Sequence, residues 1–403
     1  MRILYLTNGF PYPLTSGYLR HYFLIRELSQ HHAITLLSIV GANFANENIA
    51  ALAPFTERVL TFTSKSKSGS LRRKVIGRVK SLAGGPKADE AVRQMRAAVE
   101  RMTREEPFDV VVFSGKRTYP AIQDLVALPL VVDMCDATSM KIRGSVRYTS
   151  PARLPLLLLD YAQVRSAERM LIRNAAHLLF ASYRDREALV GRTGNHATVV
   201  PNGVDLDFWR RSSPERGANT IVFTGAMDYP PNTDAALHLI EEILPLLQRA
   251  IPDARVLIVG RDPTPRLVRA GQRPGVTVTG FVDDVRPYLE QATVFAAPLR
   301  FGAGIQNKVL EAMAMEVPVV ASLLAADGLR TEDGQQPPVA VARGAQEFAD
   351  LIGQRLRDRA GDPAPDSAAR RYVESHFVWR RSGEKLEQVI NSVMKHTAVK
   401  WDT

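Results

Sequence analysis

Short apolar runs alternate along the whole chain with longer stretches of helix-forming residues. Several of these runs are apolar throughout, as expected for parallel strands that helices cover on both faces. The alternation therefore predicts an α/β fold with parallel sheets. The runs predicted as strands are residues 3–7, 34–39, 59–63, 109–113, 130–133, 178–181, 220–224, 255–259, 276–279, 293–297, 317–321 and 339–342.

The chain's length and its turn signals predict two domains in series. At 403 residues it is long enough for two domains of roughly 180–200 residues each. A Pro-Asn-Gly turn at 201–203 and a polar stretch at 210–219 place the boundary between about 185 and 205. We expect a first domain at 1–190, a second at 200–365, and terminal helices at 366–395.

Composition and charge limit the compartment and the partners. A single cysteine, Cys135, excludes an intramolecular disulfide and favours a reducing cytoplasm. No run approaches the roughly 20 apolar residues that span a bilayer, and the N-terminal apolar run stops at Asn8, too early for a signal peptide. The net charge of +10 suits nucleoside diphosphates, lipid phosphates or an anionic membrane. Nucleic acid is disfavoured, because the basic runs lack interleaved aromatic residues and DNA-binding spacings.

The stretch from Phe301 to Lys308 predicts a phosphate-binding turn. Glycines at 302 and 304 permit a tight turn, and strong helix formers follow. A helix N-terminus after such a turn offers unpaired N–H groups and a positive dipole end to a phosphate.

Side chains on the same helix suit the rest of a nucleotide sugar. Lys308 lies in the first turn, and Glu311 shares its face. They would supply a cation for a diphosphate and a carboxylate for sugar hydroxyls. Ile305, Gln306 and Asn307 would offer backbone N–H groups to the donor.

This stretch resembles the donor-site signature of GT-B glycosyltransferases, especially glycosyltransferase family 4. There a small-residue turn leads into a Lys/Arg-x-x-Glu-Ala-Met/Leu-Ala helix and a Pro-Val-Val strand. Further segments resemble the family in order and spacing: 11–28, 200–208, 223–228 and 276–284. The resemblance implies a GT-B fold, with two Rossmann-like domains facing each other across a cleft and C-terminal helices returning to the first domain.

Two departures from the family pattern concern charge. Family members often carry two glutamates eight residues apart, but Ala303 stands at the first position. Many also carry an Arg and a Lys where this chain has Ala226 and Pro231. The variant is similar to a bacterial subgroup associated with exopolysaccharide loci. Lys308 and Arg261 would then carry the charge that faces the phosphates.

The resemblance implies further donor contacts. Gly17 would allow the backbone to approach the diphosphate closely, and Gly225 would form the first turn of the nucleotide domain. Val282 would hold the base through backbone groups, which do not distinguish uracil from guanine.

Asp133 and Asp136 lie at the C-terminal end of a predicted parallel strand, where open α/β sheets bind ligands. The family often has a His or Asp near the transferred sugar at this strand end. Both aspartates are candidates for a catalytic role, with Asp136 ranked first. Lys141 and Arg143 would meet an anionic acceptor.

Residues 65–80 hold seven basic side chains and no acidic one, with apolar residues at helical spacing. Such a helix can lie on an anionic membrane, with Arg72, Arg73 and Lys74 facing lipid phosphates. The alternative is a solvated surface helix.

The combined hypothesis is a retaining glycosyltransferase of cell-surface polysaccharide synthesis. It would use a nucleoside-diphosphate sugar and a glycan or lipid-linked acceptor, without metal or cofactor, in the cytoplasm or on the inner face of the plasma membrane. The alternatives are a glycosyltransferase acting on a soluble natural product, a GT-B sugar-nucleotide epimerase, and a non-catalytic binder.

Overall fold

The computed structural model describes residues 1–14, 18–64, 89–125, 128–192, 194, 196–212, 217–358 and 366–401. The chain forms two compact units. The first comprises Met1–Ala181, Asp185–Pro201 and Trp379–Thr403, and the second comprises Ser182–Arg184 and Asn202–Val378. The terminal helices are divided between them: α14 (Ser367–His376) belongs to the second unit and α15 (Trp379–Trp401) to the first.

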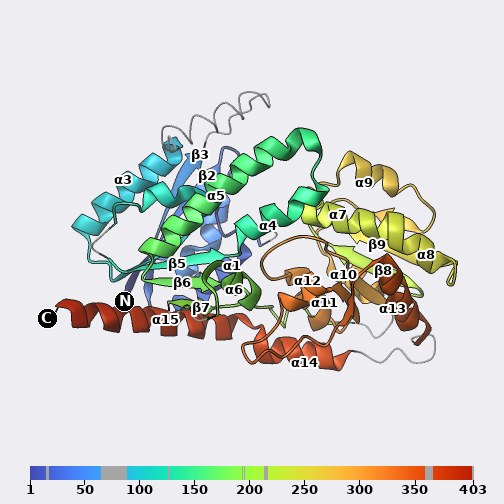
Figure 1. Cartoon of the computed structure of the whole chain (residues 1–403). Coiled ribbons are helices and arrows are strands. Elements are labelled where there is room, and N and C mark those ends of the chain that lie inside the picture. Colours follow the sequence, from blue (N-terminus) through green and yellow to red (C-terminus); the bar gives the residue numbers. More distant parts are fainter. Residues whose placement is uncertain are drawn as a thin grey trace. The chain divides into compact units, whose positions relative to one another are not determined.

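The first unit is built on a seven-stranded parallel sheet in the order β3-β2-β1-β4-β5-β6-β7 (Figure 1). Its strands are β1 (Arg2–Thr7), β2 (Ala33–Gly41), β3 (Arg58–Ser64), β4 (Val110–Ser114), β5 (Leu130–Cys135), β6 (His177–Phe180) and β7 (Ala197–Val199). Its α-helices are α1 (Leu19–Leu28), α3 (Glu90–Glu105), α4 (Thr138–Ser145), α5 (Leu154–Asn174) and α15, and α6 (Tyr183–Val190) follows β6. Short 3-10 helices are η1 (Asn46–Ala51), η2 (Ala53–Phe55), η3 (Lys116–Ala121), η4 (Val146–Tyr148) and η5 (Pro151–Arg153).

The second unit has a six-stranded parallel sheet in the order β10-β9-β8-β11-β12-β13. Its strands are β8 (Thr220–Thr224), β9 (Arg255–Val259), β10 (Val276–Val278), β11 (Val294–Ala297), β12 (Val319–Ser322) and β13 (Ala340–Ala342). Its helices are α7 (Pro230–His238), the π-helical turn η6 (Leu239–Ile243), α8 (Leu244–Gln248), α9 (Pro265–Ala270), α10 (Arg286–Gln291), α11 (Asn307–Ala314), α12 (Leu323–Asp327), α13 (Ala345–Asp358) and α14.

The predicted α/β class with parallel sheets is confirmed, and every predicted strand run overlaps a strand. The run 317–321 starts too early, since β12 begins only at Val319. Glu316 turns the backbone with a positive φ of 57°, and Pro318 has no N–H to give to a ladder. The prediction missed β7, a strand of three residues.

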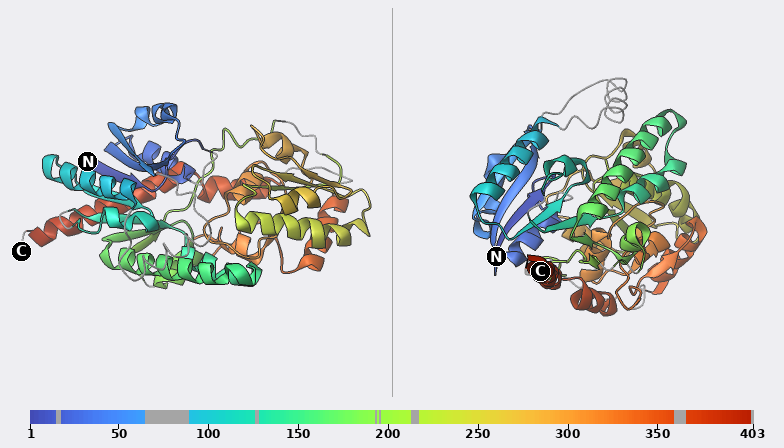
Figure 2. Two further views of the ribbon diagram at one scale, coloured as in Figure 1. Left: turned by 90° about the horizontal axis from the view of Figure 1, so that it is seen from above. Right: turned by 60° about the vertical axis from the view of Figure 1, so that its left-hand side comes forward.

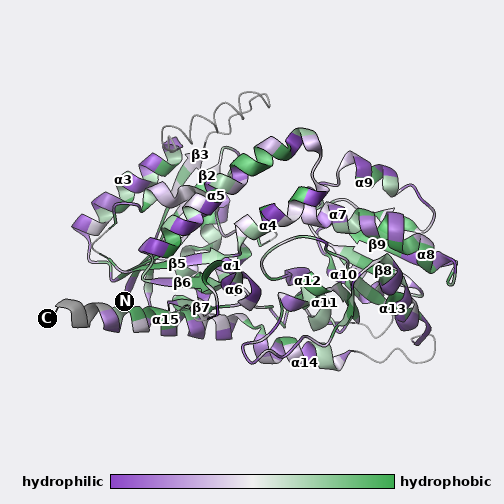
Figure 3. Cartoon of the chain, viewed as in Figure 1, coloured by the Kyte–Doolittle hydropathy of each residue, from purple (hydrophilic) through white to green (hydrophobic). Residues whose placement is uncertain are grey.

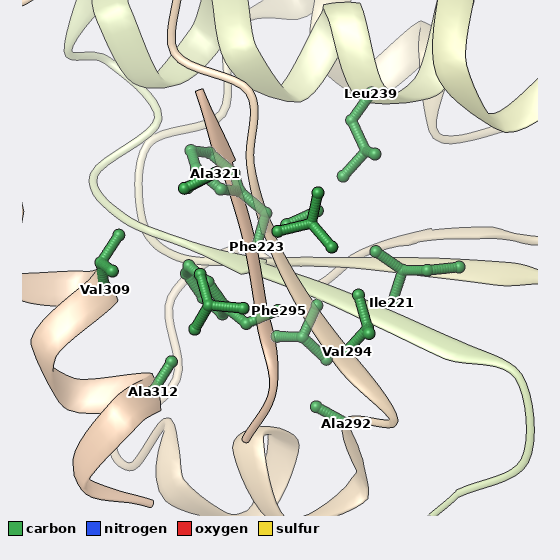
Figure 4. Close-up of a cluster of buried hydrophobic side chains, with 14 of the residues drawn as sticks. Ile221, Phe223, Leu239, Ala292, Val294, Phe295, Val309, Ala312 and Ala321 are labelled. Atoms are coloured by element: carbon green, nitrogen blue, oxygen red, sulfur yellow. The ribbon is translucent and has the colours of Figure 1, made fainter. Parts of the chain in front are cut away.

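The core of the second unit fixes the orientation of α11. Phe223 of β8 and Phe295 of β11 are fully buried, with ring centroids 6.3 Å apart. Val309 and Ala312 of α11 are buried on the side of that helix that faces these rings (Figure 4). Because this apolar side is locked into the core, the opposite side of α11 is left to carry polar residues.

Helix α15 is anchored to the first unit through its first residue. The Trp379 ring stacks on Phe23 of α1, with centroids 4.6 Å apart and planes within 8°. The two helices lie side by side (Figure 2), and Gly383 approaches α1 so closely that a Cβ there would lie 2.4 Å from Glu27 Cβ. Leu386 and Ile390 continue the buried face of α15.

We predict that Trp379→Ala destabilises the first unit by about 3–5 kcal/mol, because the truncation removes a buried aromatic ring and leaves a cavity. Urea unfolding followed by circular dichroism measures this change. The matched control is Arg380→Ala, whose side chain is 84% exposed and which should shift stability by less than about 0.5 kcal/mol. Equal effects of the two substitutions would contradict the anchoring role of Trp379.

Candidate functional site

The turn before α11 has the backbone shape that the sequence predicts. Gly302 and Gly304 have φ values of 154° and 73°, which favour glycine. Helix α11 follows with Gln306 at its N-cap, and no described side chain caps it by a hydrogen bond. The N–H of Val309 donates to the Gln306 carbonyl at 2.9 Å, which leaves the N–H groups of Asn307 and Lys308 and the positive end of the helix dipole to suit an anion.

Lys308 is held in a defined position in this first turn. Its ammonium group donates a hydrogen bond to the side-chain oxygen of Asn232 and lies 5.0 Å from the ring centroid of Phe223. Asn232 is buried, and its Nδ2 donates to the carbonyl of Ala226 at 3.0 Å. Lys308 is also the single lysine in the sequence between residues 202 and 378.

Glu311 and Lys308 shift each other's ionisation while both are partly buried. Burial lowers the pKa of Lys308 to about 8, although the carboxylate of Glu311 opposes the shift. Burial raises the pKa of Glu311 to about 7, and the ammonium group of Lys308 opposes that shift. Near neutral pH, an arriving anion can therefore change the protonation of this pair at small cost in free energy.

Two glycines allow the ends of β8 and β9 to approach each other closely beside Asn232. Gly225 follows β8 with a φ of 153°, and a Cβ there would lie 2.6 Å from the Asn232 amide nitrogen. Gly260 follows β9 with a φ of 149°, and its Cβ would lie 1.8 Å from the Gly225 carbonyl oxygen. Any side chain at Gly225 would displace Asn232, which would move the partner of Lys308.

Arg261 lies at the same carboxyl edge of the sheet. Its guanidinium group pairs with Asp262 at 2.7 Å, and its side chain is 42% exposed. Because exposed ion pairs of this kind contribute little stability, the guanidinium can exchange its carboxylate partner for a phosphate.

The other donor candidates differ in how far they are buried and in their contacts. Val282 and Ile305 are partly buried against the core of the second unit. Phe281, next to Val282, is by contrast 64% exposed. The side-chain oxygen of Asn307 accepts a hydrogen bond from Asn202 Nδ2 at 2.9 Å, which ties the start of α11 to the beginning of the second unit.

In the first unit, Asp133 forms a buried ion pair with Arg20. Its Oδ2 accepts from Arg20 Nε at 2.7 Å, and its Oδ1 accepts from the Cys135 backbone at 3.0 Å. Burial would raise the pKa of Asp133, but the Arg20 charge holds it below its usual value. The structure thus gives Asp133 a structural role in place of the sugar contact considered above, because both of its oxygens are occupied and its side chain is buried.

Asp136 is partly exposed at the end of the same strand and is surrounded by cations. Its Oδ1 lies 3.1 Å from Lys116 Nζ, and its Oδ2 lies 3.5 Å from Lys141 Nζ. Lys116 also donates to the Met134 carbonyl and to Thr138 Oγ1. Burial would raise the pKa of Asp136, but the two lysines hold it far below its usual value. Asp136 therefore stays ionised, able to accept a hydrogen bond from a sugar hydroxyl but poorly suited to remove a proton.

Sequence reasoning missed several of these residues. No local pattern in the sequence marks Asn232 or Lys116 as a site residue. Arg20 and His21 of α1 fit the solvated face of a helix equally well. In the structure both are buried, and His21 Nδ1 lies 3.0 Å from the Tyr5 hydroxyl. Burial lowers the pKa of His21 to about 4, so the ring is neutral. The available signal was Tyr5 itself, since a tyrosine in a buried strand requires a polar partner.

Some candidates lie outside the described residues or away from these clusters. Gly17 and the basic residues Arg72, Arg73 and Lys74 fall in segments that the structure does not describe, so the hypotheses about them stay predictions. Arg143 is exposed on α4.

Among the residues that the structure describes, no three or more His, Cys, Asp or Glu side chains are grouped so that they could hold a metal ion. No helix in the described part of the chain is long and apolar enough to cross a membrane.

Comparison with known proteins agrees with this geometry. Residues 218–358, which contain the α11 site, match the family model described as glycosyl transferases group 1. The chain has a GT-B fold, and residues 218–358 are similar to the glycosyl transferases of group 1.

Curated relatives of this GT-B chain carry the names of mannosyltransferases. A GDP-mannose-dependent monoacylated alpha-(1-6)-phosphatidylinositol monomannoside mannosyltransferase of Corynebacterium glutamicum is 27% identical over 227 residues, covering 49% of this chain and 58% of that protein. The phosphatidyl-myo-inositol mannosyltransferase of Mycobacterium tuberculosis is 32% identical over 198 residues, covering 44% and 51%. The chain thus spans only about half to three fifths of the length of these relatives.

Solved GT-B structures match over nearly the whole chain. Anabaena HepE in complex with UDP-glucose has a TM-score of 0.68 at 15% identity, covering 97% of this chain and all of that one. Sucrose-phosphate synthase of Thermosynechococcus elongatus has a TM-score of 0.70 at 14% identity, covering 98% and 99%. At these identities the matches establish the shared fold.

We predict that the Lys308 ammonium group titrates near pH 8 and that Glu311→Gln lowers this pKa further, because the carboxylate stabilises the charged lysine. Competitive acetylation with acetic anhydride across pH, read by mass spectrometry of the Lys308 peptide, measures the pKa. Glu384→Gln, which removes a carboxylate in the other unit, is the control and should leave it unchanged. A Lys308 pKa at the value of an ordinary lysine would contradict the buried pair.

Proposed function

We propose that this chain is a glycosyltransferase that moves a sugar from a nucleoside-diphosphate sugar to a glycan or lipid-linked acceptor. The observation that carries the proposal is the α11 site, where a helix N-terminus without a side-chain cap, a positioned lysine and a partly buried glutamate follow a glycine turn. The first two suit a diphosphate, and the carboxylate suits ribose hydroxyls.

Stabilisation of the departing diphosphate is the chemistry that this site can supply. Lys308, Arg261 and the N–H groups of α11 would offset the negative charge that develops as the sugar–phosphate bond breaks. Asn232 would hold the lysine at its position before the donor arrives, so little reorganisation is needed at the moment of reaction. The reaction we propose is metal-independent and retaining, with the acceptor hydroxyl attacking on the side where the leaving phosphate can take its proton.

The acceptor side of the proposal is supported by the first unit and by the relatives. Asp136, ionised between Lys116 and Lys141, would accept a hydrogen bond from a sugar hydroxyl. Both mannosyltransferases reported above are named for phosphatidylinositol-based acceptors, and the net charge of +10 suits an anionic partner. We propose a cell-surface glycan pathway, such as exopolysaccharide synthesis, at the inner face of the plasma membrane.

We expect Lys308→Ala to weaken nucleoside-diphosphate binding by about 1.5–3 kcal/mol, since a charged hydrogen bond to phosphate is lost. Isothermal titration with UDP and GDP measures the affinity, and release of nucleotide from a panel of UDP, GDP and dTDP sugars measures turnover. Affinity of the native protein should fall as pH rises through about 8, where Lys308 loses its charge, and Lys308→Ala should abolish that fall.

Lys308→Arg, which keeps the charge, and Arg266→Ala, which removes an exposed cation paired with Glu241 in the same unit, are the matched controls. Arg266→Ala should bind nucleotide like the native protein, and Lys308→Arg should retain part of the affinity. Unchanged affinity in folded Lys308→Ala protein would remove Lys308 from the site, and nucleotide binding without any sugar transfer would favour a non-catalytic binder.

We also predict that turnover survives a strong chelator, because the charge on the diphosphate is met by Lys308, Arg261 and the helix N-terminus. The measurement is the transfer rate after dialysis against EDTA, compared with the same protein given Mg²⁺ or Mn²⁺. Loss of activity on chelation that either cation restores would sink the metal-independent mechanism.

A further inference from the structure

The segment from the end of β5 to the first six residues of α5 has an unusual charge pattern. Residues 137–159 include Lys141, Arg143, Arg147 and Arg153 but no acidic residue. The ammonium group of Lys141 forms an ion pair with Asp136. The guanidinium groups of the three arginines form no ion pair with any residue that the structure describes. All three arginines are exposed. The segment therefore presents uncompensated positive charge.

The same segment exposes large apolar side chains. Met140 and Tyr148 are each 43% exposed, Val146 is 36% exposed and Leu158 is 53% exposed. Isolated exposed apolar residues are ordinary, but contiguous ones mark interaction surfaces.

Helix α5 adds to this apolar surface. Of its 21 residues, the buried ones are Val164, Glu168 and Leu171, all in the C-terminal two thirds. The run of leucines at 154 and 156–159 at its start has no buried member. Figure 3 shows hydrophobic residues gathered in the N-terminal half of α5 and hydrophilic ones toward its C-terminal end. The apolar start of the helix has thus not been used to build the core.

These residues belong to neighbouring elements. Helix α4 packs against both η4 and α5, with the Ser139 N–H donating to Glu168 Oε1 at 3.0 Å, and η5 lies against α5. We call the exposed residues that these elements carry the α4–α5 surface: Met140, Val146, Tyr148 and Leu158, with Arg143, Arg147 and Arg153.

We propose that the α4–α5 surface docks the first unit on an anionic membrane. Arginine pairs with lipid phosphates through its planar group of donors, and apolar side chains beside it can enter the boundary between headgroups and acyl chains. A second copy of the chain would bring the same positive charge to the contact, and a nucleic acid offers no apolar phase for Leu158 and Val146. The combination of positive charge and exposed apolar side chains fits a lipid surface best.

The test is co-sedimentation of the full chain with vesicles, without any donor, so that it is independent of sugar transfer. The native protein should pellet with vesicles of phosphatidylglycerol and phosphatidylcholine but not with phosphatidylcholine alone. The triple variant Arg143→Gln, Arg147→Gln, Arg153→Gln should bind about a hundredfold more weakly at low salt, since each basic residue near an anionic surface contributes about fivefold.

Two further variants separate insertion from adsorption and from general charge. Val146→Ser with Leu158→Ser should keep binding at low salt but lose the part that resists 0.1 M salt, where screening has shortened the Debye length to about 10 Å. The matched control is Arg101→Gln, Arg104→Gln, Arg173→Gln, which removes three exposed arginines from α3 and the far end of α5. It should bind vesicles nearly as the native protein does. Circular dichroism of each variant checks the fold.

Four outcomes of the vesicle experiments would overturn the proposal, and a fifth comes from the oligomeric state. The four are absence of vesicle binding by the native protein, equal binding by the arginine triple variant, an equal loss in the control triple, and loss only when Arg72, Arg73 and Lys74 are reversed in charge. In the last case the predicted basic helix at 65–80 would be the membrane contact. A native dimer in sedimentation velocity that the arginine triple variant dissociates would assign the surface to self-association instead.

Discussion

The packing of α11 against β8 and β11 is the contact on which the candidate donor site depends. Val309 and Ala312 are buried against Phe223 and Phe295, so the rotation of the helix about its axis is set by the core. This rotation brings Lys308 beside the Phe223 ring and the Asn232 oxygen. A residue of the core thus also contacts the candidate catalytic cation, which couples the position of the charge to the stability of the second unit.

The second unit lacks two charges that are common in the family that the sequence resembles. Where members of that family often carry an Arg and a Lys, this chain has Ala226 and Pro231, and its structure puts a neutral amide, Asn232, next to one lysine. Partial burial lowers the pKa of that lysine, and Glu311 limits the shift. An ammonium group in a poorly solvated place attracts an anion more strongly than the same group in bulk water, because the local dielectric is low.

The first unit uses buried charge for a different purpose. The Arg20–Asp133 pair joins α1 to the end of β5, and Arg20 also donates to the Val200 carbonyl at 2.7 Å, next to the point where the chain enters the second unit. A buried pair of this kind contributes little net stability, since desolvation offsets most of the attraction, but losing one partner leaves a buried charge unpaired. The pair therefore specifies where α1 and residue 200 lie. The partly exposed Asp136, three residues from Asp133, is held between Lys116 and Lys141 instead.

The sequence alone determined most of the elements and the helix of the candidate donor site, and the tertiary structure decided which side chains pair with one another. Apolar runs and helix formers predict β8, β9 and α11 because local periodicity and glycine turns report backbone shape directly. Lys308 and Glu311 could be chosen because both lie on one short helix, at a spacing that needs no knowledge of the fold. Asn232, Lys116 and Arg20 could not, since their partners lie 76, 20 and 113 residues away along the chain. The sequence also could not predict the different roles of Asp133 and Asp136. The two lie three residues apart on one strand end, and only the packing of α1 over one of them makes it a buried anchor while the other stays open to a ligand.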